Sequence, residues 1–261
     1  MSQHLSNSVS AGRVLVEDVG RVRVLTLDNE AKLNSFDRAM LTQLTGAIID
    51  ADRDPNVGAI VVTGAGRAFC AGGDTSAMGS DMSATDSYDF LVEFVHPVKL
   101  ALVESSTPTI AMINGAAVGA GLSIALACDL RVCVESAVLS APYVRAGLVA
   151  GDGSAWLLPR LVGMGRALDL ILTGRRISPD EALSWGLVNR VTAAVDLREE
   201  TLALAATIAD LPSRAVGESK RLIADSLNVS LRQALPRGGY GAAALQAGIE
   251  HRAVIEKLRG S

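Results

Sequence analysis

The chain has 261 residues, of which 49% are hydrophobic and 20% are charged, and its formal net charge is -4. This length is enough for a full hydrophobic core in one large domain or in a domain with an appended piece. The charged residues form no long block of one sign, so the sequence gives no indication of nucleic acid or an anionic membrane as a partner and favours small-molecule chemistry.

The cysteines and the hydropathy pattern indicate the cellular compartment. Cys70, Cys128 and Cys133 lie in apolar segments without C-x-x-C spacing, which favours a reducing environment over a disulfide framework or a metal site. The first residues are polar, and no uncharged apolar run reaches the roughly 18 residues that a membrane span needs. We therefore expect a soluble cytoplasmic protein without a metal site, whose residues 1–12 are disordered.

The first predicted elements are a hairpin, a helix and a strand. Residues 13–28 contain two β-rich runs around a turn at Asp18–Gly20, a pattern typical of a hairpin. Residues 35–54 carry apolar side chains at helical spacing, with Ser35 as a possible N-cap. Residues 57–64, VGAIVVTG, predict a short buried strand.

Strands and helices continue to alternate as far as Gly153. Residues 83–105 predict a helix that shapes substrate choice, and a strand, a helix and one or two further strands follow at residues 107–114, 119–129 and 130–142. This order predicts an α/β fold with helices packed on sheets.

The chain after Gly153 is mostly helical in pattern. We expect an α/β core over residues 1–195 and a C-terminal helical region over residues 196–261. The helices of this last region are apolar and rich in alanine, and one short arm cannot bury all their faces, which favours association between subunits.

Two glycine-rich segments follow predicted strands. Residues 63–78 contain the first, and Gly119–Ala120–Gly121 opens a predicted helix. Glycine lets a ligand approach the main chain, and the first amides of a helix lack intrahelical partners. Two amides, near Ala71 and near Ala120, could therefore form an oxyanion hole for one carbonyl oxygen. The alternative is that the glycines only provide positive φ angles in wide loops.

Five segments of the chain resemble the crotonase superfamily, the enoyl-CoA hydratases and isomerases. They are AFCAGGD (68–74), INGAAVGAGLSIALACDLRV (113–132), GLVAGDG (147–153), LPRLVG (158–163) and LTGRRISPDEALSWGLVNRV (172–191). The resemblance implies a crotonase-like spiral of ββα units with a C-terminal helical arm, assembled as a homotrimer or a hexamer. It also implies an acyl-CoA substrate whose thioester carbonyl sits in the oxyanion hole, with no separate cofactor.

The resemblance also implies binding residues. By position, the two oxyanion-hole amides belong to Ala71 and Ala120. The substrate-binding positions that match the family are Lys32, Leu33, Ala68, Gly72, Gly73, Asp74, Gly119 and Gly151. A cationic Lys32 suits a nucleotide phosphate, and the alternative is a solvated surface lysine.

The chain departs from the family at the catalytic positions. Similar hydratases use two glutamates to activate water and deliver a proton, and Ser123 and Tyr143 stand at these positions. Neither hydroxyl is an effective general base near neutral pH, which puts the two-glutamate mechanism in doubt. As the simpler alternatives, Ser123 is a small residue at a helix start and Tyr143 fills a pocket wall.

Asp152 is the remaining acid/base candidate. Some isomerases of the superfamily carry a single acid at the position of Gly151, and Asp152 is the next residue. Its spacing from Tyr143 resembles the branch of 6-oxocamphor hydrolase, in which a histidine takes the place of the tyrosine. The alternative is a turn aspartate that caps the helix beginning at Ser154.

These residues favour an acyl-CoA-processing enzyme of the enoyl-CoA hydratase/isomerase type. Two alternatives are an acyl-CoA binding protein without turnover and a C–C bond hydrolase. A third is a serine hydrolase, because GLSIA around Ser123 approaches a nucleophile elbow and His251 follows it. His96, which precedes Pro97, is predicted to end a helix and to have no catalytic part.

Overall fold

The computed structural model describes residues 12–74 and 82–259, so the prediction for the first twelve residues lies outside the described residues except at Gly12. The strands are β1 (Arg13–Val19), β2 (Val22–Asp28), β3 (Ala59–Gly64), β4 (Ala68–Cys70), β5 (Thr109–Ile113), β6 (Ala116–Val118), β7 (Leu130–Val134), β8 (Leu139–Ser140), β9 (Arg176–Ile177) and β10 (Arg190–Thr192).

The α-helices are α1 (Arg38–Arg53), α2 (Ala84–Phe90), α3 (His96–Glu104), α4 (Ala120–Ala127), α5 (Ser154–Val162), α6 (Met164–Thr173), α7 (Pro179–Ser184), α8 (Leu197–Ala209), α9 (Ser213–Ser226), α10 (Leu231–Gln246) and α11 (Ile249–Arg259). The 3-10 turns are η1 (Glu30–Lys32) and η3 (Tyr143–Ala146), and η2 (Leu91–Val95) is a π-helical turn.

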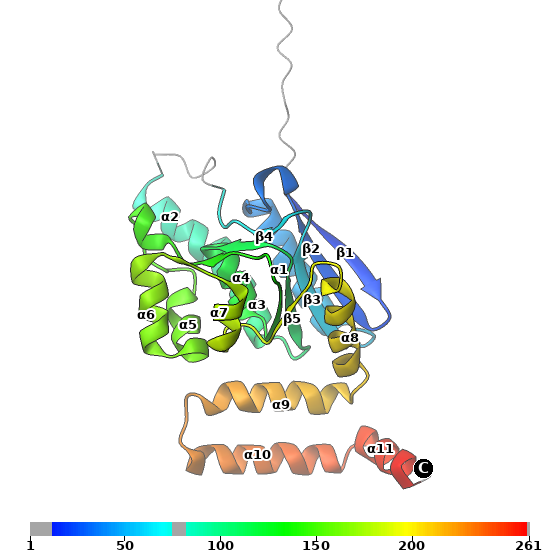
Figure 1. Cartoon of the computed structure of the whole chain (residues 1–261). Helices are drawn as coiled ribbons and strands as arrows, with labels where there is room; N and C mark the ends of the chain where they lie inside the picture. Colours follow the sequence, from blue (N-terminus) through cyan, green and yellow to red (C-terminus); the bar gives the residue numbers. More distant parts are fainter. Residues whose placement is uncertain (1–11, 75–81, 260–261) are drawn as a thin grey trace, which may run out of the picture.

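Two sheets form the core of the molecule. In the described residues the larger sheet has the order β1-β2-β3-β5-β7-β10, and the smaller has the order β4-β6-β8-β9. Three successive strand pairs divide in the same way, because β3, β5 and β7 join the larger sheet whereas β4, β6 and β8 join the smaller one. A helical segment follows each pair. This repetition confirms the predicted α/β spiral of ββα units (Figure 1).

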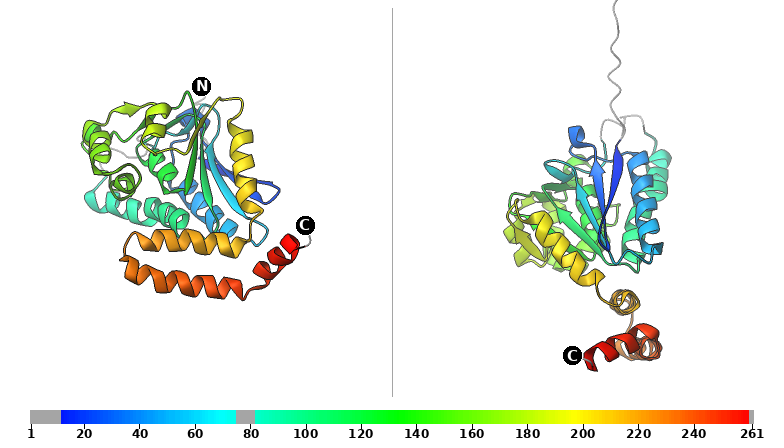
Figure 2. Two further views of the ribbon diagram at one scale, coloured as in Figure 1. Left: turned by 60° about the horizontal axis from the view of Figure 1, so that its bottom comes forward. Right: turned by 90° about the vertical axis from the view of Figure 1, so that its right-hand side faces the viewer.

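The strand patterns of the sequence match the sheet. β1 and β2 form the predicted antiparallel hairpin, from Arg13 opposite Asp28 to Val19 opposite Val22, and Gly20 supplies the turn with a φ of +60°. Every residue of β3 is buried, because β2 and β5 flank it in parallel and helices α1 and α8 cover the two faces of the sheet (Figure 2).

Two local predictions are wrong. The N-cap of α1 is Asp37 and not Ser35, because the Met40 amide donates to the Asp37 carboxylate over 2.8 Å. The chain also does not leave the helix at His96, since α2, η2 and α3 follow one another directly from Ala84 to Glu104. Pro97 lies in the first turn of α3, directly after the π-helical turn, where a missing N–H is tolerated.

Helices α9 to α11 form an arm beside the core (Figures 1 and 2). α8 packs against β2, β3, β5 and β7, and α9 and α10 then lie side by side. Lys220 of α9 is held to the core by its ammonium, which lies 2.7 Å from the Asp129 carboxylate. The division at residue 195 stays a prediction, and none of the described helices is long and apolar enough to cross a membrane.

We predict that Gly121→Ala lowers the free energy of unfolding by about 1–3 kcal/mol, because its new methyl group meets backbone that must shift. A Cβ at Gly121 would approach the Cys70 carbonyl oxygen to well within van der Waals contact. Urea denaturation at one fixed protein concentration measures the change.

Gly46→Ala in α1 is the matched control, since nothing lies within 4 Å of a Cβ there. This control should raise the stability by up to about 1 kcal/mol, through helix propensity. Equal stabilities of the two variants would contradict a tight contact between α4 and β4.

Candidate active site

The two glycine-rich loops meet at one edge of the smaller sheet. β4 and β6 are parallel neighbours, so their carboxyl ends lie together. Gly72 follows β4 with a φ of +100°, and a methyl group on it would lie 3.1 Å from the Val118 carbonyl oxygen and 3.7 Å from the Ala120 nitrogen. The backbone after β4 therefore packs directly against the start of α4.

The two amides assigned to the oxyanion hole differ in their partners. Ala120 is the first residue of α4, and within the described part of the chain its N–H makes no hydrogen bond. The Ala71 N–H, in contrast, donates to the Leu33 carbonyl oxygen over 3.0 Å. The positive end of the α4 dipole thus has an unpaired donor, which suits an oxygen that develops negative charge.

The residues predicted to contact coenzyme A gather around the same loop. The Lys32 ammonium lies 2.6 Å from the Asp74 carboxylate, and Leu33, with a φ of +54°, follows Lys32 directly. Gly72 and Gly73 pair with Phe36, through a hydrogen bond from the Phe36 amide to the Gly72 carbonyl and a parallel bridge at Gly73. The structure therefore brings the segment around residues 32–36 onto residues 71–74.

Asp152 lies buried beside this junction, in the turn before α5, with 3% of its surface exposed. One carboxylate oxygen accepts a hydrogen bond from the Tyr143 hydroxyl over 2.7 Å, and the other accepts from the Ser154 amide over 3.1 Å. The second bond spans two residues within the turn, and the N-cap of α5 is Gly153 without a side-chain cap, so the alternative of a helix-capping aspartate is wrong. Both donors are neutral groups, so the described side chains pair no cation directly with this carboxylate.

Tyr143 connects Asp152 to the start of α4. A methyl group on Gly119 would lie 3.8 Å from the Tyr143 ring, and the Tyr143 hydroxyl is also 2.9 Å from the Ser154 hydroxyl. Burial, together with the neighbouring Asp152, raises the pKa of the Tyr143 phenol well above its ordinary value. Tyr143 therefore stays protonated and acts as a donor to the carboxylate, not as a base.

Ser123 supports the turn that carries Asp152. Its side chain is fully buried, and its hydroxyl donates to the backbone carbonyl of Asp152 over 3.1 Å. This hydroxyl is thus not hydrogen-bonded to His251 or to any other histidine that the structure describes. The geometry gives no support to a serine nucleophile.

Helix α3 brings two more side chains to the turn. Sequence reasoning had given His96 no part in the site and had missed Lys99. His96 donates from Nε2 to the Gly151 carbonyl over 2.9 Å. Lys99, one turn later, is buried, and its Cγ would lie 3.6 Å from a methyl group on Gly153. The sequence did contain a signal for Lys99, which is the single lysine in the apolar pattern VHPVKLALV. It follows His96 by three residues, a spacing that places both side chains on one face of a helix.

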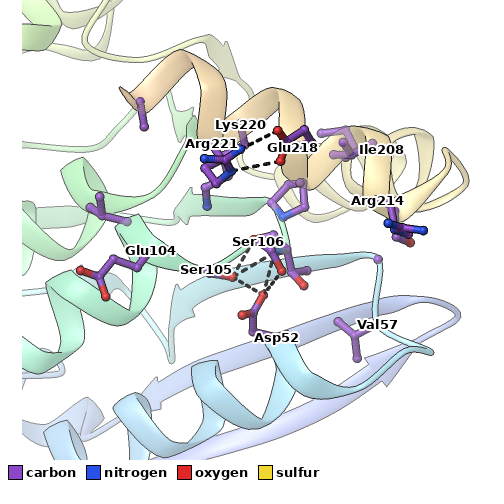
Figure 3. A pocket seen from close by; sticks show the side chains of 18 of the residues that line it. Asp52, Val57, Glu104, Ser105, Ser106, Ile208, Arg214, Glu218, Lys220 and Arg221 are labelled. Atoms are coloured by element: carbon purple, nitrogen blue, oxygen red, sulfur yellow. Dashed lines mark hydrogen bonds and ion pairs between the residues drawn. The ribbon is translucent and has the colours of Figure 1, made fainter. Parts of the chain in front are cut away.

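A cavity of about 700 Å³ lies elsewhere, between α9 and the core (Figure 3). Its wall includes Asp52, whose carboxylate accepts hydrogen bonds from Ser105, Ser106 and the Thr107 amide. Burial by itself would raise the pKa of Asp52, but these hydrogen bonds outweigh it and keep the pKa below its ordinary value. None of the candidate site residues lines this cavity, so the cavity and the candidate site around Asp152 are separate.

Known proteins share both the sequence and the fold of this chain. Residues 17–257 match the family model described as enoyl-CoA hydratase/isomerase. A probable enoyl-CoA hydratase of Mycobacterium bovis is 36% identical over 224 residues, which cover 85% of each chain. A 4-chlorobenzoyl coenzyme A dehalogenase of an Arthrobacter species is 33% identical over 227 residues, covering 86% of this chain and 82% of the other.

The solved structures agree with these relatives. The crystal structure of an enoyl-CoA hydratase from Bacillus anthracis superimposes with a TM-score of 0.91 at 30% identity, and the match covers 95% of this chain and 96% of that one. Because the family model and these alignments extend over most of the chain, they apply to the core and the candidate site alike. The chain therefore belongs to the enoyl-CoA hydratase/isomerase family and is an enzyme of the hydratase/isomerase type.

Proposed function

We propose that this enzyme acts on an acyl-CoA thioester through an enolate-like anion, held by backbone amides, and that Asp152 moves the proton. The observation that carries the proposal is the position of the unpaired Ala120 amide, since the adjacent Gly119 lies against Tyr143 and Tyr143 donates to Asp152. A donor for a developing oxyanion and a carboxylate base are thus linked through one side chain.

The proposed oxyanion hole needs a second donor, and we assign it to the Ala71 amide. This amide now donates to the Leu33 carbonyl, so a bound thioester oxygen must share its hydrogen with Leu33 or take it over. The close approach of Gly72 to the Ala120 nitrogen supports this assignment, because it keeps the two amide-bearing loops together.

Asp152 is the proposed base. Its two oxygens accept one hydrogen bond each from described protein groups, whereas an ionised carboxylate has about four acceptor sites. Lone pairs therefore remain for a substrate proton, while Tyr143 and Ser154 fix the orientation of the group. A single acid/base residue of this kind fits proton transfer at the carbon next to the thioester better than two-glutamate hydration, because Ser123 and Tyr143 replace the glutamates.

The proposed contacts to coenzyme A use the loop around Lys32 and Asp74. Their ion pair orients the Lys32 ammonium near residues 71–74, where a cation suits a nucleotide phosphate. The reaction proposed here needs no group besides the acyl-CoA. A cytoplasmic location is proposed as well, supported by the free thiols of Cys70, Cys128 and Cys133.

We also propose that copies of the chain assemble through the arm into a homotrimer or a hexamer. Large apolar side chains are exposed on its helices, and they include Ile223, Leu227, Leu231, Leu235, Tyr240 and Ile249. Apolar patches of this kind mark contacts between proteins.

Asp152→Asn should lower kcat by about 10²- to 10⁴-fold and change acyl-CoA affinity much less, because it removes the base but keeps the shape. The measurement is mass-spectrometric turnover with a panel of 2-enoyl-, 3-enoyl- and 3-oxoacyl-CoA thioesters and a cyclic β-diketone. Tyr143→Phe keeps the Asp152 carboxylate but removes one hydrogen bond to it, and should lower kcat by about 10- to 100-fold. Full turnover by Asp152→Asn would exclude this base, and tight acyl-CoA binding without any product would favour a binding protein.

Ala120→Pro should lower kcat by about 10²- to 10³-fold, because proline removes one oxyanion-hole donor while its ring is accepted at the first position of a helix. Met164→Pro is the matched control, since Met164 is the first residue of α6, is 65% exposed and lies outside both the arm and the candidate site. The control should keep its turnover. Equal turnover in both variants would remove the Ala120 amide from the mechanism.

Ile223→Glu should break the assembly, because it places a charge in the proposed apolar contact. Ser226→Glu adds the same charge at an exposed polar position of the same helix. Sedimentation velocity should show an oligomer for the wild type and for Ser226→Glu, and smaller species for Ile223→Glu. A wild-type monomer would contradict the proposed assembly.

A further inference from the structure

Lys99 carries a buried side-chain nitrogen without a hydrogen-bond partner among the described residues. The residue is 6% exposed, and among the described residues its Nζ is the single buried side-chain nitrogen or oxygen that is unsatisfied. Burying a charge without a partner destabilises a fold strongly. An apolar side chain at this position of α3 would avoid that penalty, so the lysine calls for a functional explanation.

The surroundings of Lys99 contain one anion. The titratable groups that face its side-chain nitrogen are Asp152, from the turn before α5, Cys70 of β4, and Cys128 after α4. The extended segment before α1 contributes the uncharged ring of Phe36, whose centre is 5.8 Å away. Burial raises the pKa of the Cys70 thiol to about 11 and that of the Cys128 thiol to about 12. Both thiols are therefore neutral near pH 7, and Asp152 is the charged group that interacts electrostatically with Lys99.

Helix α3 also fixes the place of this anion. His96 holds the Gly151 carbonyl from one side of the turn, and the aliphatic part of Lys99 lies against Gly153 on the other side. The two residues are three positions apart, so they share one face of the helix. The turn that carries Asp152 is thus seated against a single helix face.

We propose that Lys99 is a positioning residue, whose stem packs against the turn that carries Asp152 and whose buried side-chain nitrogen places a positive charge that acts on the Asp152 carboxylate. It acts through space and forms no hydrogen bond to the carboxylate, so it leaves the lone pairs of Asp152 open. The catalytic consequence rests on the proposed function, in which Asp152 is the base.

The coupling between the two charges is reciprocal. Burial lowers the pKa of Lys99, and Asp152 opposes this effect by favouring the ammonium form. An opposite charge at close range typically displaces a pKa by about 1 or more. Removing either charge should therefore move the titration of the other group by a similar amount, with or without substrate.

The first experiment is an NMR titration of the full chain with ¹³C at the ε-carbon of lysine. The sequence has four lysines, at positions 32, 99, 220 and 257, and Lys99→Met identifies the resonance of Lys99. Asp152→Asn should move the Lys99 midpoint to lower pH by about 1 or more. The Lys220 resonance is the internal control, because Lys220 pairs with Asp129. An unchanged Lys99 midpoint in folded Asp152→Asn would overturn the proposal.

The second experiment compares Lys99→Met with Lys99→Arg on a substrate that the wild type turns over. Lys99→Met should move the acidic limb of the kcat profile to higher pH by about 1, because the carboxylate loses a neighbouring positive charge. Lys99→Arg keeps the positive charge, so the acidic limb of its kcat profile should stay at the same pH as in the wild type. In the Asp152→Asn background, Lys99→Met should cause no further loss of kcat. If Lys99 were purely structural, the losses of kcat caused by the two substitutions would instead be additive.

Thermal melting separates this role from a structural one. Lys99→Met replaces an unpaired buried charge by an apolar side chain, so its Tm should equal or exceed that of the wild type. A lower Tm together with an unmoved acidic limb would assign Lys99 to stability alone. If no thioester of the panel reacts, the proposed function fails while the NMR titration still decides the coupling between Lys99 and Asp152.

Discussion

The close packing of two backbone segments, at Cys70 and at Gly121, determines the geometry of the whole site. β4 and β6 run side by side in the smaller sheet, and α4 begins where β6 ends. Any side chain at Gly121 would meet the Cys70 carbonyl, so glycine is what allows the helix to start against the neighbouring loop. This contact leaves the Ala120 amide at an unshielded helix end and sets Gly119 against Tyr143.

The acid/base cluster shows how a buried carboxylate is held without a direct ion pair. Tyr143, Ser154 and Ser123 use neutral donors to fix the Asp152 side chain and its backbone. These bonds compensate for desolvation and occupy one acceptor site on each carboxylate oxygen. In the cavity under α9, by contrast, one carboxylate oxygen of Asp52 accepts three hydrogen bonds (Figure 3).

Local sequence signals predicted which helices and strands exist better than they predicted where each one begins and ends. The apolar run of β3 and the two halves of the first hairpin were recognisable because burial dictates side chains at every position of such strands. The sequence pattern predicted Ser35 as the cap of α1, whereas the structure has Asp37. Pairing of Phe36 with the Gly72–Gly73 loop decides between them, because it keeps residue 36 extended and delays the helix. No pattern within the helix itself contains that information.

The sequence alone determined the family and the α/β spiral, because motif order and side-chain periodicity are properties of the chain itself. It also singled out Asp152 and Tyr143, whose hydrogen bond only the fold created. The partner of the Ala71 amide and the isolation of the Lys99 ammonium were decided by tertiary structure alone. Both depend on which distant segments pack together, and a hydrogen bond or a buried charge exists only once its neighbours are in place.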